Sequence, residues 1–368
     1  MVTIAVLYGG RSGEHEVSLC SAASVVSFLD KQKYSIIAVG IDKRGVWHVQ
    51  EEPSIVDDPE FGRKLAMART GPWLVNHYER ENKLVMLNPA SGKSVSADVV
   101  FPVLHGTYGE DGTLQGLLEL AMVPYVGADV LGSSVGMDKD VAKRLLESAR
   151  VPVVPWITVH KSDWIAARAS ITEQAQSELG LPMFIKPACT GSSVGISKVK
   201  SRDALDDAMT KAFKFDTRVL IEKAVQCREI ECAVLGNERP QASVLGEIVP
   251  RHEFYSYEAK YIDPNGAELR IPADISPRLA ETIRDTACRG YSALGCGGMA
   301  RVDFFLEKNT GEFFLNEINT LPGFTSISMY PKLWEASGLS YADLLDRLVD
   351  LALERHRARL AVQTDFTR

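Results

Sequence analysis

Apolar residues gather along the chain in short runs separated by glycine-rich or polar turns, and their order predicts the first part of the fold. Residues 2–8 form an apolar, β-branched run typical of a strand, and the glycine-rich stretch "GGRSGEHEVS" follows it. A helix-like segment at 19–30 leads to a second apolar run at 35–42, and a third occupies 97–106. Because strand, helix and strand alternate, we expect a parallel sheet. The polar, irregular segment 47–95 is interpreted as an elaborated edge of this first domain.

The pattern changes at about residue 128. The next segments predict, in order, a turn and helix at 133–149, a proline-punctuated link at 151–159, two strands joined by a glycine-rich turn at 181–199, and a capped helix from Ser201 to Phe215. The apolar run at 218–225 is expected to begin a third, mostly antiparallel region.

Two helices are predicted in that third region. The first spans 277–294, with Ser276 as its cap, Pro277 in its first turn and Gly295 just beyond its end. The second runs from Ser340 to about residue 357, with a leucine stripe and a basic final turn that suits the helix dipole. The fold class is therefore α/β, with an α+β arrangement in the later part of the chain.

A hairpin near the end of the chain gathers the most distinctive polar residues. The stretch "FFLNEINTLPG" follows the apolar run "ARVDFF", and "KNTG" between them is a plausible turn. If the turn is centred on Thr310, Asp303 faces Glu317 and Arg301 faces Asn319 on one face of the ladder, with opposed side chains about 5 Å apart. Carboxylate and amide oxygens are ligands that Mg²⁺ takes when phosphates complete its shell. The alternative is an Arg301 salt bridge with two spectator acids, and the hairpin alone leaves both open.

Length, charge and cysteines narrow the function classes. The chain of 368 residues suggests two or three domains. Its net charge is −7, with no block of five like charges and no Lys/Arg stripe, which argues against a nucleic-acid surface. No apolar run approaches the roughly 18 residues of a membrane helix, and the N-terminus lacks the features of a signal peptide. We expect a cytoplasmic protein whose six scattered cysteines are buried thiols.

Further segments could hold an anion. In "KPACTGSSVGI", residues 186–196, small residues would let backbone N–H groups surround a phosphate while Lys186 supplies a cation, although an ordinary hairpin turn is the alternative. The stretch is not a Walker loop, because its Lys precedes the glycines. Lys139 in "GMDK" would more often be a solvated residue. The polar, tyrosine-rich segment 252–266 contains Lys260 and Tyr261 and has the length of a lid or binding loop.

Taken in order, these motifs resemble the ATP-grasp enzymes and, closely, the D-alanine:D-alanine ligases of bacterial cell-wall synthesis. The resemblance runs through "GGRSGEHEVSL", "HGTYGEDGTLQG", "GMDK", "KPACTGSSVGIS", "IEKAVQCRE", "FYSYEAKY", "ARVDFF" and "NEINTLPGFTSIS". It implies a Rossmann-like N-terminal substrate domain at 1–127, a small central ATP-grasp domain at 128–221, and a large C-terminal domain at 222–368 with a lid loop at about 245–266. The segment 47–95 is similar to the longer form of the family.

The resemblance also implies a site and its ligands. ATP would lie between the central and C-terminal domains, with two Mg²⁺ ions, for which Mn²⁺ could substitute, on Asp303, Glu317 and Asn319. The nucleotide would contact Lys139, Lys186, Ser193, Glu222, Val225, Glu229 and Lys260. The substrates, two D-alanine molecules, would be handled by Glu14, His105, Ser192, Tyr261, Arg301, Gly323 and Ser328. A homodimer through the N-terminal domain is expected, with no nucleic-acid or membrane partner.

Rival functions differ in the second substrate or in catalysis itself. In similar enzymes that make a D-lactate ester, the lid position that matches Tyr261 is His or Phe. The tyrosine at this position therefore favours the dipeptide over a D-lactate or D-serine product. A non-catalytic nucleotide sensor on the same fold could lose Arg301 or a metal ligand, yet all of these residues are present.

Overall fold

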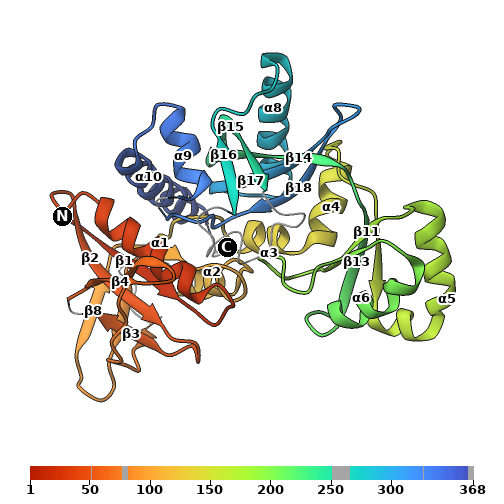
Figure 1. Cartoon of the computed structure of the whole chain (residues 1–368). Helices are drawn as coiled ribbons and strands as arrows, with labels where there is room; N and C mark the ends of the chain where they lie inside the picture. Colours follow the sequence, from red (N-terminus) through yellow and green to blue (C-terminus); the bar gives the residue numbers. More distant parts are fainter. Residues whose placement is uncertain (51, 77–81, 251–265, 326, 364–368) are drawn as a thin grey trace.

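The computed structural model describes residues 1–50, 52–76, 82–250, 266–325 and 327–363. Figure 1 shows three lobes: an N-terminal lobe at the lower left, a lobe built around α5 and α6 at the right, and a C-terminal sheet with α8, α9 and α10 above them. The described residues contain no helix long and apolar enough to cross a membrane.

The N-terminal lobe is built on a four-stranded sheet in the order β3-β2-β1-β9. Strand β1 pairs in parallel with both β2 and β9, which confirms the predicted parallel sheet, and β3 adds an antiparallel edge. The elements of this sheet and its helices are β1 (Val2–Gly9), α1 (His15–Phe28), β2 (Tyr34–Ile41), β3 (Trp47–Gln50), β9 (Val99–Val103) and α2 (Thr113–Leu120).

The segment expected to be irregular contains short strands. A two-stranded hairpin, β4-β5, packs on α1, and three further strands form a small antiparallel sheet. These strands are β4 (Ile55–Asp58), β5 (Gly62–Leu65), β6 (Leu74–Asn76), β7 (Leu84–Leu87) and β8 (Ser94–Ala97).

The second lobe is a four-stranded antiparallel sheet, β10-β13-β11-β12, with a hydrophobic core of its own. Strand β13 lies inside this sheet, so the expectation that it begins the third region is wrong: it pairs with both β10 and β11. The link at 151–159 likewise contributes an edge strand. The elements are β10 (Trp156–His160), α5 (Lys161–Glu178), β11 (Met183–Pro187), β12 (Ser197–Val199), η1 (Arg202–Ala204), α6 (Leu205–Ala212) and β13 (Arg218–Lys223).

Two consecutive helices connect the first lobe to the second. The sequence predicted a turn followed by one helix here, but residues before Asp138 are also helical. Asp138 has extended backbone angles (φ −87°, ψ 101°), ends the first helix and caps the second by accepting from the N–H groups of Asp140 and Val141. The helices are α3 (Val130–Met137) and α4 (Lys139–Ser148).

The C-terminal sheet is antiparallel throughout, in the order β16-β15-β14-β17-β18. The helix predicted after Ser276 is present, with Ser276 accepting from Leu279 N and Pro277 in the first turn. The last helix begins where it was expected, and Ser340 caps it. The elements are β14 (Cys227–Gly236), β15 (Gln241–Pro250), β16 (Ala267–Arg270), α8 (Pro277–Ala293), β17 (Gly298–Glu307), β18 (Phe313–Asn319), α9 (Met329–Ala336) and α10 (Tyr341–Leu360).

One hydrophobic core joins the first and last lobes. Buried side chains of β1, α1 and β9 pack in the same cluster as those of α9 and α10. Arg355 on α10 donates to the carbonyl oxygens of Tyr125 and Gly127 and lies over the Tyr125 ring at 4.6 Å. The N-terminal lobe is therefore fastened to the C-terminal sheet, while the lobe around α5 and α6 has a separate core.

Candidate active site

The ladder between β17 and β18 has the predicted pairing at its inner end. Asp303 lies opposite Glu317, and Arg301 lies opposite Asn319. On the other flank of β17, Glu231 of β14 is also opposite Asp303. Three acidic side chains thus form one cross-strand row, Glu231–Asp303–Glu317, and Glu231 was not among the residues that the sequence singled out.

A bulge at Asn316 produces this pairing. Nearer the turn, Phe304 pairs with Leu315, so Asn316 is an extra residue in β18 between that pair and Asp303–Glu317. In a regular strand, Leu315 and Glu317 would share a face, because side chains alternate along a strand. With the bulge, Leu315 enters the core beside Phe304, while Glu317 lies opposite Asp303 on the other face. The turn is therefore not centred on Thr310 as assumed, and the bulge compensates for the difference.

Arg301 links the acids of the row. Its Nε and Nη2 donate to the two Asp303 oxygens at 2.8 and 2.7 Å, and Nε lies 3.0 Å from Glu231 Oε2. Asn319 Nδ2 donates to Asp303 Oδ2 at 3.0 Å. Burial alone would lower the pKa of Arg301, but the charges of Asp303 and Glu231 outweigh it and raise that pKa well above its usual value. Arg301 is thus a permanent cation among carboxylates.

The donor set fits a hard cation that also takes oxygen atoms from another molecule. The described residues contain no group of three or more His, Cys, Asp or Glu side chains able to hold a metal by themselves. Asp303 and Glu317 supply two carboxylates from directly opposed positions, and Asn319 adds an amide beside them. Such incomplete oxygen sites suit Mg²⁺ that is shared with substrate phosphates.

The second lobe contributes a buried glutamate that pairs with two lysines, one of which contacts β18. Glu222 on β13 is 1% exposed, and its carboxylate pairs with Lys186 and, at 2.8 Å, with Lys143. Burial would raise the pKa of Glu222, but the charges of Lys186 and Lys143 lower it to about 2. Lys186 Nζ also lies 3.4 Å from Asn316 Oδ1, so the bulge reaches the lysine expected to bind phosphate. Sequence reasoning missed Lys143, whose burial was not visible in its helical pattern.

Lys139 begins helix α4 and is directed to the glycine-rich loop, where its Nζ donates to the carbonyl oxygen of Thr190. Asp138 caps the helix and pairs with Arg218. Burial lowers the pKa of Lys139, against the opposing charge of Glu317. The lysine that looked like a solvated residue therefore lies beside the loop.

The glycine-rich loop reaches from the second lobe to the first. Ser192 Oγ donates to Glu14 Oε1, although the residues are 178 positions apart. Ser192 and Ser193 both have positive φ, +47° and +60°, which non-glycine residues adopt at a cost and mostly at functional sites. A Cβ at Gly106 would lie 2.7 Å from Glu14 Oε2, and one at Gly191 would lie 3.1 Å from it. Glycine at both positions leaves room for the carboxylate.

A second buried group lies next to Glu14. His105 contacts Leu321 O through Nδ1 at 3.0 Å and Ser21 Oγ through Nε2 at 3.1 Å. Burial lowers the pKa of His105, against the opposing charge of Glu14. Glu110 accepts from Gly106 N at 2.7 Å, and burial followed by the charge of Glu14 raises the pKa of Glu110 to about 8. Glu110 stood inside the quoted "HGTYGEDGTLQG" stretch, yet no role was assigned to it.

The segment after β18 carries the remaining residues expected on the substrate side. Ser328 Oγ accepts from Thr325 N at 2.9 Å and lies 2.7 Å from Thr325 Oγ1. A Cβ at Gly323 would lie 2.8 Å from Ser328 Oγ, so these two residues are neighbours. Phe324 is fully buried in the shared core, which fixes this segment against the N-terminal lobe.

Other expected site residues are only partly placed. Glu229 lies on β14 opposite Phe305, on the same strand face as Glu231, and Val225 lies in the connection before β14. Of the expected lid, residues 245–250 are the end of β15, whereas Lys260 and Tyr261 lie outside the described residues.

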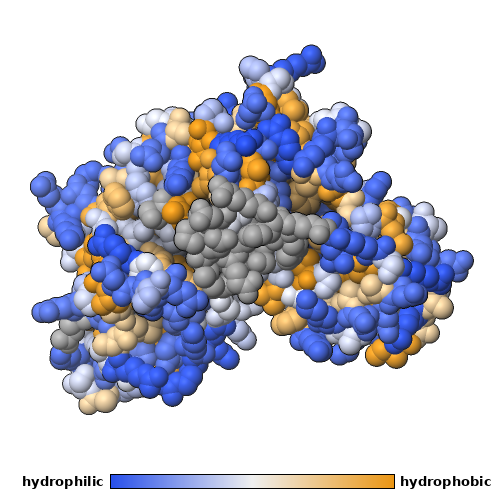
Figure 2. Space-filling view, in the orientation of Figure 1, coloured by the Kyte–Doolittle hydropathy of each residue, from blue (hydrophilic) through white to orange (hydrophobic). Residues whose placement is uncertain are grey.

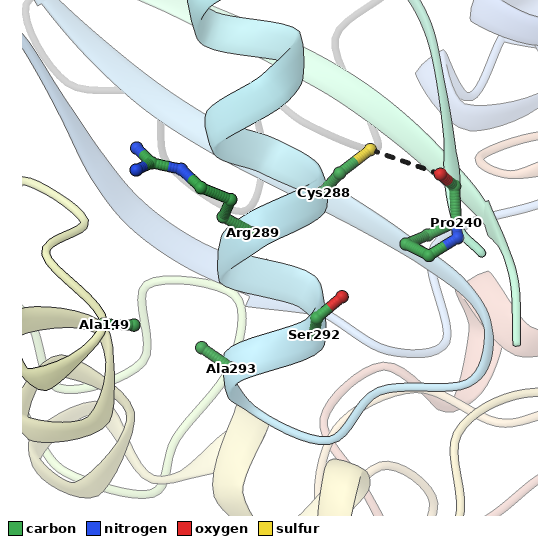
Figure 3. A pocket seen from close by; sticks show the side chains of 6 residues that line it. All are labelled: Ala149, Pro240, Cys288, Arg289, Ser292 and Ala293. Atoms are coloured by element: carbon green, nitrogen blue, oxygen red, sulfur yellow. Dashed lines mark hydrogen bonds between the residues drawn. The ribbon is translucent and has the colours of Figure 1, made fainter. Parts of the chain in front are cut away.

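A shallow, open pocket of about 580 Å³ lies elsewhere, beside α8. Figure 3 shows Cys288, whose Sγ donates a hydrogen bond to Pro240 O, and Arg289, which is directed away from Cys288. Ala149, Ser292 and Ala293 complete the lining. None of the expected site residues lines this pocket.

Two family models match the chain. Residues 3–128 match the model described as "D-ala D-ala ligase N-terminus", and residues 145–350 match "D-ala D-ala ligase C-terminus".

Individual proteins and solved structures of this kind are also similar to the chain. The D-alanine–D-alanine ligase A of Bradyrhizobium diazoefficiens is 50% identical, with 99% of this chain and 98% of that protein covered. The enzyme of the same name from Escherichia coli K12 is 48% identical, with 98% of both chains covered. Among solved structures, the D-alanine-D-alanine ligase from Coxiella burnetii is 37% identical (TM-score 0.80, 98% of this chain and 97% of that one), and the VanG D-Ala:D-Ser ligase from Enterococcus faecalis is 36% identical (TM-score 0.81, 95% and 99%).

Proposed function

The chain belongs to the D-alanine–D-alanine ligase family, and we propose on that basis how the residues described above join two D-alanine molecules at the expense of ATP. It is an ADP-forming ligase with the ATP-grasp fold predicted from its motifs. Its product, D-alanyl-D-alanine, serves peptidoglycan synthesis. The observation that carries the proposal is the inner end of the β17–β18 ladder, where an arginine, two carboxylates and an amide share one face.

ATP would lie between the lobe around α5 and α6, which includes β13, and the C-terminal sheet. Lys139 and Lys186 would contact its phosphates, and Ser193 with the glycine-rich loop would cover them. In support, Lys139 contacts this loop at Thr190, and Lys186 contacts Asn316 beside the β17–β18 ladder. Val225 and Glu229 would lie at the adenosine. Because both oxygens of Glu222 pair with lysines, we propose that its part at the nucleotide is to hold Lys186 in place.

Asp303, Glu317 and Asn319 would hold two Mg²⁺ ions, with Mn²⁺ as a possible substitute. The oxygen-only donor set and its sharing of one face with Lys186 support this assignment. When bound, the ions would neutralise charge on the transferring phosphoryl group.

In the first step, the carboxylate of the first D-alanine attacks the γ-phosphorus, and the bond from this phosphorus to the β-phosphate oxygen breaks. ADP is the leaving group, and the D-alanine becomes an acyl phosphate. Glu14 would bind the ammonium group of this D-alanine, and the bond from Ser192 holds the Glu14 carboxylate in position. His105 would lie beside the same substrate. Lys260 would reach the γ-phosphate, and Tyr261 would complete the contacts of Ser192.

In the second step, the amine of the second D-alanine attacks the acyl carbon and inorganic phosphate leaves. Arg301 and the N–H of Gly323 would stabilise the oxyanion, a contribution typically worth about 3 to 4 kcal/mol per donor. Ser328 would bind the carboxylate of the second D-alanine, in keeping with its contact to Gly323.

A homodimer through the N-terminal domain is also proposed. Exposed apolar side chains at the end of α2 in that domain, and at the start of the adjoining α3, support it: Leu120 (75% exposed), Met122, Val130 and Leu131 (62% exposed). By contrast, hydrophilic side chains cover much of the face in Figure 2. Leu120→Asp together with Leu131→Asp should shift the sedimentation coefficient to that of a monomer. We place the enzyme in the cytoplasm, where ATP is supplied.

The test is mass spectrometry of products formed from ATP, Mg²⁺ and equal concentrations of D-alanine, D-serine and D-lactate. We expect D-alanyl-D-alanine as the main product, with one ADP for each dipeptide. A mainly D-serine or D-lactate product would contradict the proposed second substrate. ADP release that ignores D-alanine would instead favour a nucleotide sensor.

A further inference from the structure

Glu231 is a buried acid for which the proposed reaction has no use. It is 6% exposed and lies at the centre of the C-terminal sheet, directly opposite Asp303, which is itself opposite Glu317. Like charges at directly opposed positions repel. A carboxylate that stays ionised here needs a cation, and Arg301 Nε lies 3.0 Å from Glu231 Oε2.

Two carboxylates compete for the same nitrogen of Arg301. Its Nε carries one hydrogen, yet Asp303 Oδ1 lies at 2.8 Å and Glu231 Oε2 at 3.0 Å from it. Asp303 also accepts from Nη2 at 2.7 Å, in the two-pronged geometry that makes arginine–carboxylate pairs strong. A metal ion that takes an Asp303 oxygen draws on the same negative charge and therefore weakens these bonds to the guanidinium.

We propose that Glu231 is a positioning residue that holds Arg301 by its Nε edge, so that Asp303 can turn an oxygen toward a metal ion while the guanidinium stays in place. This inference rests on the proposed metal ligands. With Glu231 present, Nε–H has a second carboxylate to bond as Asp303 turns, and a buried arginine charge is not left uncompensated. Without it, Arg301 has a stronger attraction to Asp303, and metal binding has to overcome that attraction.

The sheet offers a matched control in Glu247 on β15. It is 5% exposed and pairs with Arg228 through two bonds of 2.7 Å. Glu247 lies opposite Ile230, the neighbour of Glu231 in β14. Because side chains alternate along a strand, the two glutamates project from opposite faces of the sheet. Glu247→Gln therefore removes a similarly buried charge of the same kind, away from the ladder.

The test measures Mn²⁺ binding in the presence of a non-hydrolysable ATP analogue. The readout is the electron paramagnetic resonance signal of the Mn²⁺ that stays free. We expect Glu231→Gln to weaken Mn²⁺ binding about tenfold, the lower end of what outer-shell substitutions typically cost. Glu247→Gln should leave the affinity within about twofold of the unmodified protein. Equal Mn²⁺ affinity in the Glu231→Gln variant and the unmodified protein overturns the inference.

Two further variants keep the outcomes distinct. Asp303→Asn should abolish the nucleotide-dependent Mn²⁺ site, and Mn²⁺ binding that survives it contradicts the proposed ligands. Loss in Asp303→Asn combined with no change in Glu231→Gln overturns only the role of Glu231. If Glu231→Gln does not fold, Glu231→Asp replaces it: weakened Mn²⁺ binding supports the inference, and unchanged binding overturns it.

Discussion

Ser192 in the glycine-rich loop of the second lobe donates a hydrogen bond to Glu14 at the entry to α1 in the first lobe. The bond joins the loop proposed to cover the phosphates to the carboxylate proposed to bind the first D-alanine. Nucleotide and amino-acid binding are therefore expected to depend on each other.

Ser192→Ala should lower kcat/KM for the first D-alanine by about tenfold to a hundredfold, because a hydrogen bond to a charged group is worth about 1.5 to 3 kcal/mol. Ser193→Ala is the control, since Ser193 has the same unusual backbone conformation. Its effect should fall on KM for ATP. Steady-state kinetics with each substrate varied would separate the two, and equal effects of both variants on D-alanine would argue against a specific Ser192–Glu14 contact.

Glu317→Gln should raise the Mg²⁺ concentration for half-maximal ADP release by at least about tenfold, because a carboxylate ligand is replaced by a weaker amide. Glu312→Gln, at the exposed end of the same hairpin, should leave that concentration unchanged. The measurement is a Mg²⁺ titration at saturating ATP and D-alanine. A normal titration curve for Glu317→Gln would remove it from the proposed ligands.

Lys143→Met should lower the free energy of unfolding by about 3 kcal/mol, as expected when one partner of a buried ion pair is removed. Lys143 is 2% exposed and pairs with Glu222. The double variant Lys143→Met/Glu222→Gln should lose less than the sum of the two single losses, because each single variant already removes the Lys143–Glu222 interaction, which can be lost only once. Urea unfolding checks this, with the exposed Lys161→Met as the control. Simple additivity would show that the pair is not coupled.

Glu110→Gln should reduce the loss of stability at rising pH. The pKa of Glu110 is about 8 in the folded protein and 4.5 ordinarily. Because the folded value is the higher one, the stabilisation is fully present below about pH 4.5 and is lost as the pH rises through 8. Glutamine cannot ionise, so the melting temperature of the Glu110→Gln variant should fall less between pH 5 and pH 9 than that of the unmodified protein. The exposed Glu147→Gln should follow the unmodified protein, and a Glu110→Gln curve parallel to both would contradict the raised pKa.

The sequence predicted features that depend on local signals. The parallel β1–β2 pairing and the capped helix α8 follow from an apolar run, a cap and a proline that lie next to one another in the chain. Strand β13 was assigned to the wrong sheet, because an apolar run predicts a strand without indicating which strands it pairs with.

The site was predicted where motifs carried it and missed where burial decides. Asp303, Glu317 and Asn319 lie on one face as expected, although the bulge that puts them there has no signal in the sequence. Lys143, Glu110 and Glu231 look like ordinary surface residues in a linear pattern. They stand out only once the fold has placed them beside an opposite or a like charge.

The bulge at Asn316 makes the faces of β18 depend on where its extra residue is accommodated. If Asn316 entered the regular ladder instead, the inside and outside of the strand's end would be reversed, so that Ile318 would lie opposite Arg301 and Glu317 opposite Val302. Deleting Asn316 would keep Glu317 opposite Asp303 but would remove the contact with Lys186. Homologous chains should therefore keep the bulge or have one residue fewer between Leu315 and Glu317, and an added residue there should be absent.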